Sequence, residues 1–525
     1  MKAIFNKKNL IIFSLVVFFL LMMKIDYRTG DFGKFNPTDD AGYMYHAYTV
    51  GLDFDLDYSN QIINPDKSPN PGFYLNGDTY VPKHPIGTGI LAAPFVFIGS
   101  LVEKVNTKFI FSTRDQIYFF YSLSSIFYFF ISLLLLTRTI NNSPHFKKTN
   151  PLIIFYLLLG SGIVYYSFER FSMTHTYEIF SVSLLFFISE RNKNANSNLL
   201  NYFLGLLGIL FLTIRWVNIF LILIPILYYL LIKSKKSIGI LLKSKSYYLG
   251  LLTGIIVFLL HSKVLYGVYT INPKFVYRNN LSLGFLEYAG IDSYFNIDAL
   301  ILAFKSLGII LFSREFGLLY FSPILFFSAL LIIKLIIKKQ YVIIATLIPI
   351  YGVPVAIVVL WQATGSAYGY RYLSCLIPIS IILIFRFLDE KFYKYLYLVN
   401  FLSVFLFLKF ETNQMTSLAQ EVNSFGRLHN YSGKNYIQGV SEGLFQINTY
   451  LVVIMTSFLA VICFKLAISI FGLQTIENLI EEYGYMNGDV VNFLELTVRF
   501  SYVEVLIIVS FFYYFSSKLL SKSKI

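Results

Sequence analysis

The sequence predicts an all-α membrane protein that crosses the bilayer many times and carries a large first loop outside the cytoplasm. Three observations support this prediction. The chain has 525 residues, of which 56% are hydrophobic and only 14% are charged, whereas soluble domains carry about 25% charged residues. Apolar runs of spanning length recur along the chain. The connections between alternate runs are rich in lysine and arginine, as cytoplasmic loops of membrane proteins are.

The first apolar run, from Leu10 to Met23, follows Lys2, Lys7 and Lys8. No small-residue cleavage site follows it, so we expect an uncleaved span with its N-terminus in the cytoplasm. A spanning helix needs about 20 apolar residues, and by this criterion we expect about 12–13 transmembrane helices. The further runs lie at about 116–137, 151–168, 174–189, 200–213, 217–232, 247–266, 317–337, 341–360, 372–387, 395–409, 446–470 and 500–517.

The net charge of +14 is explained by the basic connections, which all fall inside the cell if the N-terminus does. No soluble basic domain is present, so we expect no nucleic-acid partner. The outer segments are then mainly 24–115, 267–316, 361–371 and 410–446. We expect residues 1–409, including the outer loop 24–115, to form the catalytic membrane domain. Residues 410–525 add an outer loop and C-terminal membrane helices, and the topology of the last two helices stays open.

The first outer segment contains an acidic pair, Asp39 and Asp40, at the start of a predicted short helix. Helical spacing places Asp39, Tyr43 and His46 on one side of that helix. Asp39 and Asp40 also suit a simple helix start, because Thr38 can cap it and carboxylates are favoured by the helix dipole. Alternatively, a carboxylate beside the membrane can act as a general base for a hydroxyl group.

Lys83 and His84 stand just before Pro85, near the end of the same outer segment. One interpretation is a basic pair at the level of the lipid head groups. The other is a cationic contact for a phosphate, in which the lysine acts as a point charge. The two interpretations overlap when the substrate is itself a phospholipid.

Charged residues also occur where apolar runs meet the predicted outer surface. Glu169, Arg170 and His175 occupy a short turn, and Arg215, Arg314 and Arg371 lie near other outer ends. An arginine in an apolar run costs roughly 2.5–3.5 kcal/mol at the middle of the membrane, and snorkelling reduces this cost. Because guanidinium groups bind phosphate through two hydrogen bonds, Arg215 and Arg371 are the candidates for an anionic ligand.

These landmarks together resemble the GT-C superfamily of membrane glycosyltransferases, in the branch of aminoarabinose transferases and protein O-mannosyltransferases. Asp39-Asp40-Ala-Gly-Tyr43 resembles the Asp-Glu-Pro-X-Tyr motif of that branch, and Lys83-His84-Pro85 resembles its Lys-Pro-Pro element. Aspartate stands at position 40 where glutamate is usual, and His84 replaces the first proline. The likeness covers residues 1 to about 390.

The resemblance implies a GT-C-like helical bundle whose first outer loop carries juxtamembrane helices and the active site. It implies that Asp39 is the base, that Asp40 is a supporting acid and that Lys83 contacts a lipid phosphate. We expect Tyr43, His84, His175, Arg215 and Arg371 to bind the same substrate. The cofactor stays open between none and a divalent metal at Asp39 and Asp40.

The expected function is transfer of a sugar from a polyprenyl-phosphate donor to a glycan, lipid or protein acceptor outside the cytoplasm, with inversion of the anomeric carbon. Membrane lipids would surround the enzyme. One alternative is a flippase or transporter for a lipid-linked glycan, although no paired halves with interrupted helices are visible. Another alternative is a polymerase or ligase of surface glycans. Such an enzyme would be expected to have a large outer loop late in the chain, and the predicted outer loop at 410–446 fits that position.

Overall fold

The computed structural model describes residues 39–62, 73–105, 116–163, 166–167, 171–271, 317–361 and 370–412, with isolated positions between 276 and 312. At Asp39 and Asp40 it describes the backbone. The predicted spans at 10–23, 446–470 and 500–517 lie outside these residues, as do Glu169, Arg170 and Arg314.

The described part of the chain is helical apart from one hairpin, which confirms the predicted all-α class. The first elements are α2 (Asp39–Tyr48), η1 (Thr49–Asp53), β1 (Phe73–Asn76), β2 (Thr79–Pro82), α3 (Gly87–Val105), α4 (Gln116–Asn142), α5 (Pro151–Leu159), α6 (His175–Arg191), α7 (Asn198–Leu210), η3 (Phe211–Thr213) and η4 (Trp216–Leu223). The next are α8 (Ile224–Leu231), α9 (Lys235–Lys243), α10 (Lys245–Tyr266), α13 (Leu318–Phe321), α14 (Pro323–Ile337), α15 (Tyr341–Trp361), η6 (Arg371–Leu376), α16 (Ile377–Phe387) and α17 (Glu390–Thr412).

Four helices are long and apolar enough to cross a membrane, and they indicate a multi-pass membrane protein. They are Gly87–Val105, Phe120–Asn142, Lys245–Tyr266 and Tyr341–Val359. The last three coincide with predicted spans. The first forms α3, which the sequence analysis placed inside the outer loop 24–115. Shorter apolar helices occupy Asn198–Thr213, Trp216–Leu231 and Pro323–Ile337.

Several predicted spans are broken helices. The run at 217–232 begins as the 3₁₀-helix η4, the run at 372–387 begins as the 3₁₀-helix η6, and the run at 317–337 is interrupted at Ser322. In each case a proline, Pro225, Pro378 or Pro323, stands in the first turn of the α-helix that follows. Proline fits that turn but cannot donate a hydrogen bond to a preceding helix, so the α-helix starts anew there.

The run at 151–168 breaks for a different reason, because α5 ends at Leu159. A Cβ atom added to Gly160 would lie 2.1 Å from the amide oxygen of Asn400 in α17. Asn400 donates a hydrogen bond to the carbonyl of Tyr156, and Ser403 donates one to the carbonyl of Gly160. Side chains of α17 thus take over backbone acceptors where α5 stops, which a protein inside a bilayer requires.

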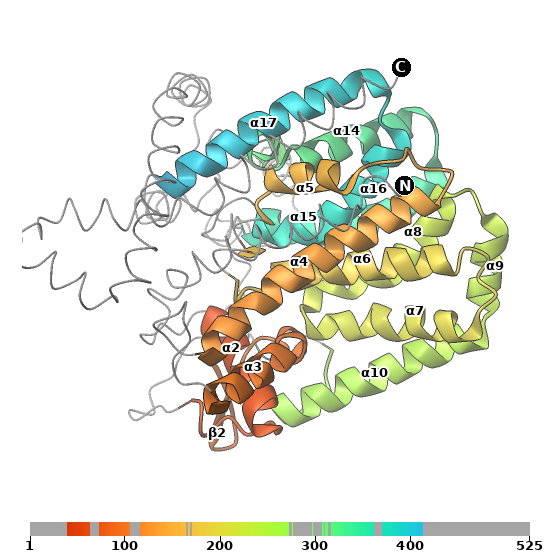
Figure 1. The fold of residues 1–525 in the computed structure, drawn as a ribbon. Coiled ribbons are helices and arrows are strands. Elements are labelled where there is room, and N and C mark those ends of the chain that lie inside the picture. The colour runs from red at the N-terminus through yellow and green to blue at the C-terminus, as the bar shows by residue number, and fades with distance from the viewer. Residues whose placement is uncertain are drawn as a thin grey trace, which may run out of the picture.

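Long helices lie lengthwise beside one another in the bundle (Figure 1). α6 is buried along most of its length, and α4 packs against it. By contrast, α10 exposes apolar side chains such as Ile256 and Leu260 on its outer side, as a helix facing lipid does. It packs closely on α7, since a Cβ atom at Gly250 would lie 2.0 Å from the Tyr202 carbonyl.

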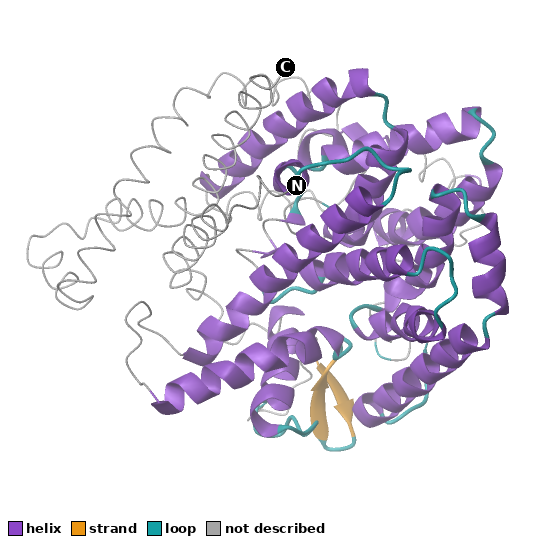
Figure 2. Cartoon of the chain, turned by 45° about the vertical axis from the view of Figure 1, so that its right-hand side comes forward, coloured by secondary structure: helices purple, strands orange, loops and turns teal. Residues whose placement is uncertain are grey.

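A two-stranded hairpin, which the sequence analysis did not predict, docks on the end of α10. β1 and β2 form an antiparallel hairpin (Figure 2), in which Phe73 lies opposite Pro82. The Asn76 amide donates to the Leu265 carbonyl at 3.1 Å, and the ring of Tyr74 packs edge-on against Tyr266. The hairpin therefore ties the first outer segment to the C-terminal end of a candidate span.

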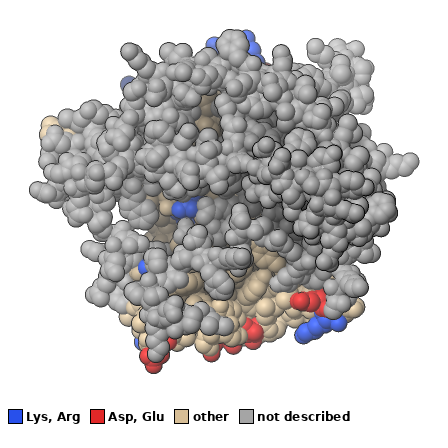
Figure 3. All heavy atoms as spheres, turned by 90° about the vertical axis from the view of Figure 1, so that its left-hand side faces the viewer, with Lys and Arg blue, Asp and Glu red and all other residues tan. Residues whose placement is uncertain are grey.

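The two ends of the bundle differ in charge. α2, α3 and the hairpin gather at one end, whereas α9 crosses the opposite end (Figure 1). Acidic side chains appear along the edge of the face seen in Figure 3, and in the first outer segment Asp53, Asp55, Asp57 and Asp78 are exposed. The opposite end carries the lysines of α9. The acidic first outer segment and the lysines of α9 therefore lie at opposite ends of the bundle, and which end faces the cytoplasm stays a prediction.

Candidate functional site

A buried ionic cluster lies where α6 begins. Glu178 is fully buried, and its two oxygens lie 3.1 Å and 3.2 Å from Nη1 of Arg215. Oε2 of the same carboxylate lies 3.0 Å from Nδ1 of His175 and accepts a hydrogen bond from Ser374 at 3.2 Å. Four polar side chains from three separate parts of the chain thus meet inside an apolar bundle.

Helix breaks bring these side chains together. His175 and Glu178 lie one turn apart at the start of α6, so they share one face. Arg215 lies between the 3₁₀-helices η3 and η4 with an extended backbone, φ −153° and ψ 141°. Ser374 belongs to the 3₁₀-helix η6. Charges buried in apolar surroundings are costly and occur where they are paired, commonly at functional sites.

The cluster does not have the geometry of a Ser-His-acid triad. In such a triad the serine and the carboxylate contact opposite nitrogens of the histidine. Here Ser374 Oγ, at 3.1 Å, and Glu178 both contact Nδ1 of His175. Ser374 also donates to the carbonyl of Arg371 at 2.8 Å. His175 therefore cannot pass a proton from the serine to the carboxylate, and its interactions fix the arrangement of the cluster instead.

The two arginines that the sequence analysis selected both lie close to the ring of one tyrosine, Tyr372. The guanidinium carbon of Arg215 lies 4.9 Å from the centre of the Tyr372 ring, and that of Arg371 lies 5.2 Å from it. Nη2 of Arg371 also donates to the Tyr372 hydroxyl at 3.3 Å. Cation–π attraction favours both contacts. The aromatic ring holds two like charges near one another while Glu178 compensates one of them.

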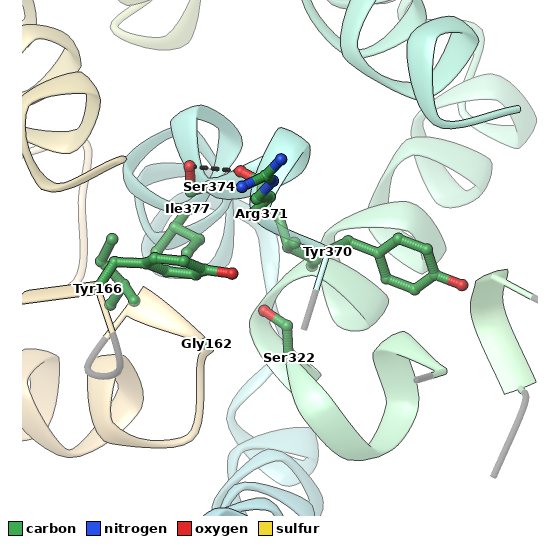
Figure 4. Close-up of a pocket in the computed structure, with 9 residues that line it drawn as sticks. Gly162, Tyr166, Ser322, Tyr370, Arg371, Ser374 and Ile377 are labelled. Atoms are coloured by element: carbon green, nitrogen blue, oxygen red, sulfur yellow. Dashed lines mark hydrogen bonds between the residues drawn. The ribbon is translucent and has the colours of Figure 1, made fainter. Parts of the chain in front are cut away.

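A pocket opens beside the cluster (Figure 4). It is lined by Gly162, Ile163, Tyr166, Ser322, Leu325, Tyr370, Arg371, Ser374 and Ile377. The hydroxyls of Tyr166 and Ser322 point toward the same space, with Arg371 on its other side. Arg371 contributes to this pocket, whereas Arg215 and Lys83 are not among its lining residues.

The first outer segment brings a second group of polar residues to this end of the bundle. The His84 ring stacks on Tyr43, with ring centres 4.8 Å apart and planes inclined by 23°. Tyr43 is buried and lies near Arg215. Partial burial lowers the pKa of the neighbouring Lys83. The Lys83-His84 turn is thereby connected, through Tyr43, to the buried ionic cluster.

The backbone of the Lys83-His84 turn is held by His46 and Tyr266. Nε2 of His46 lies 2.7 Å from the His84 carbonyl, and Nδ1 lies 2.6 Å from the Tyr58 hydroxyl. Burial lowers the pKa of His46 to about 3, so it is neutral at physiological pH. The carbonyl can only accept, which assigns the proton to Nε2. The Tyr266 hydroxyl lies 3.1 Å from the carbonyls of both Lys83 and His84.

The predicted site residues therefore fall into two neighbouring groups. Tyr43, His84 and Lys83 lie in the first, and Asp39 and Asp40 begin the helix α2 that carries Tyr43. His175 and Arg215 lie in the second, and Arg371 contacts the ring of Tyr372, which Arg215 also contacts. Among the side chains that the structure describes, no three His, Cys, Asp or Glu groups form a metal-binding cluster.

Sequence reasoning missed Glu178 and Ser374, and it placed His46 beside Tyr43 on one side of the helix without assigning it a role. A signal for Glu178 was present, because it lies three residues after His175 in a helix that has no other charged residue before its last turn. An ionisable residue inside a membrane segment is a functional candidate by default. Ser374 carried no such signal, and the contacts of Ser374 and His46 could not be predicted because their partners are distant in sequence.

Comparisons of the chain with protein-family models, with curated proteins and with solved structures found no match.

Proposed function

We propose that the protein is a membrane glycosyltransferase of the GT-C type. It transfers a sugar from a polyprenyl-phosphate donor to an extracytoplasmic acceptor, with inversion of the anomeric carbon. One observation carries the proposal: the first outer segment packs its Tyr43–His84 pair beside a buried Glu178–Arg215 ion pair at one end of an apolar helical bundle. A polar site so costly to build inside the membrane points to function rather than stability.

The donor phosphate binds on the side of the first outer segment, beside Lys83 and His84. The leaving polyprenyl phosphate gains negative charge during transfer, and preorganised cations stabilise that charge. Lys83 supplies one cation on a turn whose carbonyls are fixed by His46 and Tyr266. Arg215 supplies a second positive group nearby, although Glu178 holds its guanidinium and limits it to a long-range contribution.

The attacking hydroxyl must lose a proton, and Asp39 is the proposed general base. It begins α2, four residues before Tyr43, at the end of the bundle where the polar groups gather. A phosphate leaves without taking up a proton, so a general acid is unnecessary and one carboxylate suffices, in contrast to glycoside hydrolases. Direct attack from the opposite face of the sugar inverts the anomeric carbon.

The test is an assay of the purified protein with a panel of polyprenyl-phosphate sugars. The expected result is release of polyprenyl phosphate from at least one donor. Movement of an intact lipid-linked glycan across liposomes without release would instead identify a flippase.

A further inference from the structure

Ser322 has the features of a ligand-binding residue. Its side chain is 3% exposed, and its hydroxyl finds no hydrogen-bond partner among the residues that the structure describes. Ser322 is the N-cap of α14, where a serine oxygen usually accepts a backbone N–H of the first turn. It makes no such bond here. The hydroxyl points instead into the pocket (Figure 4), and a buried hydroxyl without a partner is unfavourable unless a ligand satisfies it.

The surroundings of this hydroxyl favour an oxyanion. The 15-residue helix α14 starts directly after Ser322, and the positive end of its dipole faces the pocket. Arg371 lines the same pocket, with a guanidinium suited to phosphate or carboxylate. Tyr166 adds another hydroxyl directed at the space. Leu325, Ile163 and Ile377 line the remaining wall and keep the surroundings apolar, which strengthens an electrostatic interaction.

This pocket differs from the proposed donor side. Lys83 and His84 do not line it, and Arg215 is occupied by Glu178. Both guanidinium groups lie close to the ring of Tyr372, but only Arg371 lines the pocket. A second substrate of a transferase needs a binding place beside the donor, within reach of the same base.

We propose that Ser322, Arg371 and Tyr166 form a second anion-binding subsite, which holds a phosphate or carboxylate group of the acceptor. This inference rests on the proposed transferase function, because it assigns the acceptor to this pocket and the donor to the Lys83-His84 turn. It makes the acceptor an acidic glycan or an anionic lipid rather than a neutral sugar.

The first experiment titrates the purified protein with inorganic phosphate at constant ionic strength and follows the melting temperature. Phosphate should raise the melting temperature of the wild type, because a ligand that binds the native state stabilises it. Arg371→Gln should weaken the apparent affinity at least roughly tenfold and Ser322→Ala roughly threefold. Arg371→Lys should retain part of the rise in melting temperature that phosphate causes in the wild type.

Arg386→Gln is the matched control, because Arg386 is a partly buried arginine that donates to the Leu231 carbonyl. It should lower the melting temperature without changing the response to phosphate. No phosphate response in the wild type, or an undiminished response in Arg371→Gln, would overturn the subsite.

A second experiment separates the subsite from the donor side by measuring binding of a short-chain polyprenyl phosphate. Its affinity should fall in Lys83→Gln and stay within about twofold of the wild type in Ser322→Ala. Equal losses in both variants would assign the pocket to the donor and refute the acceptor role. If no polyprenyl-phosphate sugar is turned over, the proposed function fails, but a phosphate response that depends on Ser322 and Arg371 still identifies an anion site.

Discussion

Arg215 and Glu178 form an ion pair inside the helical bundle, 37 residues apart in sequence and with Nη1 3.1 Å and 3.2 Å from the two carboxylate oxygens. Glu178 is fully buried, and His175 and Ser374 contact its second oxygen. A buried pair contributes little net stability, yet loss of one partner leaves an uncompensated charge. Glu178→Gln and Arg215→Gln should therefore each lower the free energy of unfolding by about 3–5 kcal/mol.

Thermal unfolding in detergent checks this prediction through a double-mutant cycle. The double variant should lose clearly less than the sum of the single variants, because no charge remains unpaired. The exposed pair of Lys334 and Asp389, 2.7 Å apart, provides the control, and Asp389→Asn should cost at most about 1 kcal/mol. Additive losses for Glu178 and Arg215 would contradict the predicted coupling.

Asp39→Asn tests the proposed general base. The variant should keep expression and donor binding but lose turnover by roughly 10²–10⁴, the usual contribution of a general base. Asp40→Asn, the matched neighbour, should cost less. Release of polyprenyl phosphate measures turnover, and NMR of the product gives the anomeric configuration. A fully active Asp39→Asn enzyme would rule out this base, and retained configuration would rule out direct displacement.

The orientation in the membrane is tested with single cysteines at Asp39 and Lys83. Both belong to the end of the bundle that carries α2 and the hairpin, so both should react with an impermeant thiol reagent added to intact cells. A cysteine at Lys235, in α9 at the opposite end, should react only after permeabilisation. If the Lys235 cysteine reacted in intact cells and the other two reacted only after permeabilisation, the protein would have the opposite orientation.

His46 makes the stability of the first outer segment dependent on pH. It is neutral in the folded protein, with a pKa of about 3, whereas in the unfolded chain it takes up a proton near pH 6.5. Between these two pH values the unfolded state binds more protons than the folded state. The contribution of His46 to the free energy of unfolding is therefore fully present above pH 6.5 and is lost as the pH falls toward 3. Within this range, the decrease in the free energy of unfolding that is due to His46 approaches roughly 1.4 kcal/mol per pH unit.

His46→Gln should reduce the slope of the melting temperature between about pH 6 and pH 4, since glutamine does not titrate in this range. His145→Gln is the control, because His145 is exposed at the opposite end and its pKa is lowered mainly by modest burial, with Arg386 and Lys233 nearby. It should change the slope less. An unchanged slope in His46→Gln would show that His46 is accessible to protons in the folded state.

The positions of most helices could be predicted from the sequence, and their interruptions could not. α4, α10 and α15 coincide with predicted apolar runs, because apolar length is a local property. The end of α5 at Leu159 depends on Asn400, which approaches from a helix distant in sequence. Pro225, Pro323 and Pro378 were local signals for three further breaks, but apolar runs alone do not reveal them.

By itself, the sequence determined the helical class, the apolar segments that indicate a multi-pass membrane protein and the polar residues that stand out against them. Arg215 and Arg371 were selected because an arginine in an apolar run is costly, and Tyr43, Lys83 and His84 were selected because their motifs resemble those of a known family. Only the tertiary structure decided their partners: Glu178 for Arg215, Tyr43 for His84, and Ser322 beside Arg371. These pairings join residues far apart in the chain, and helix packing rather than local periodicity sets which of them meet.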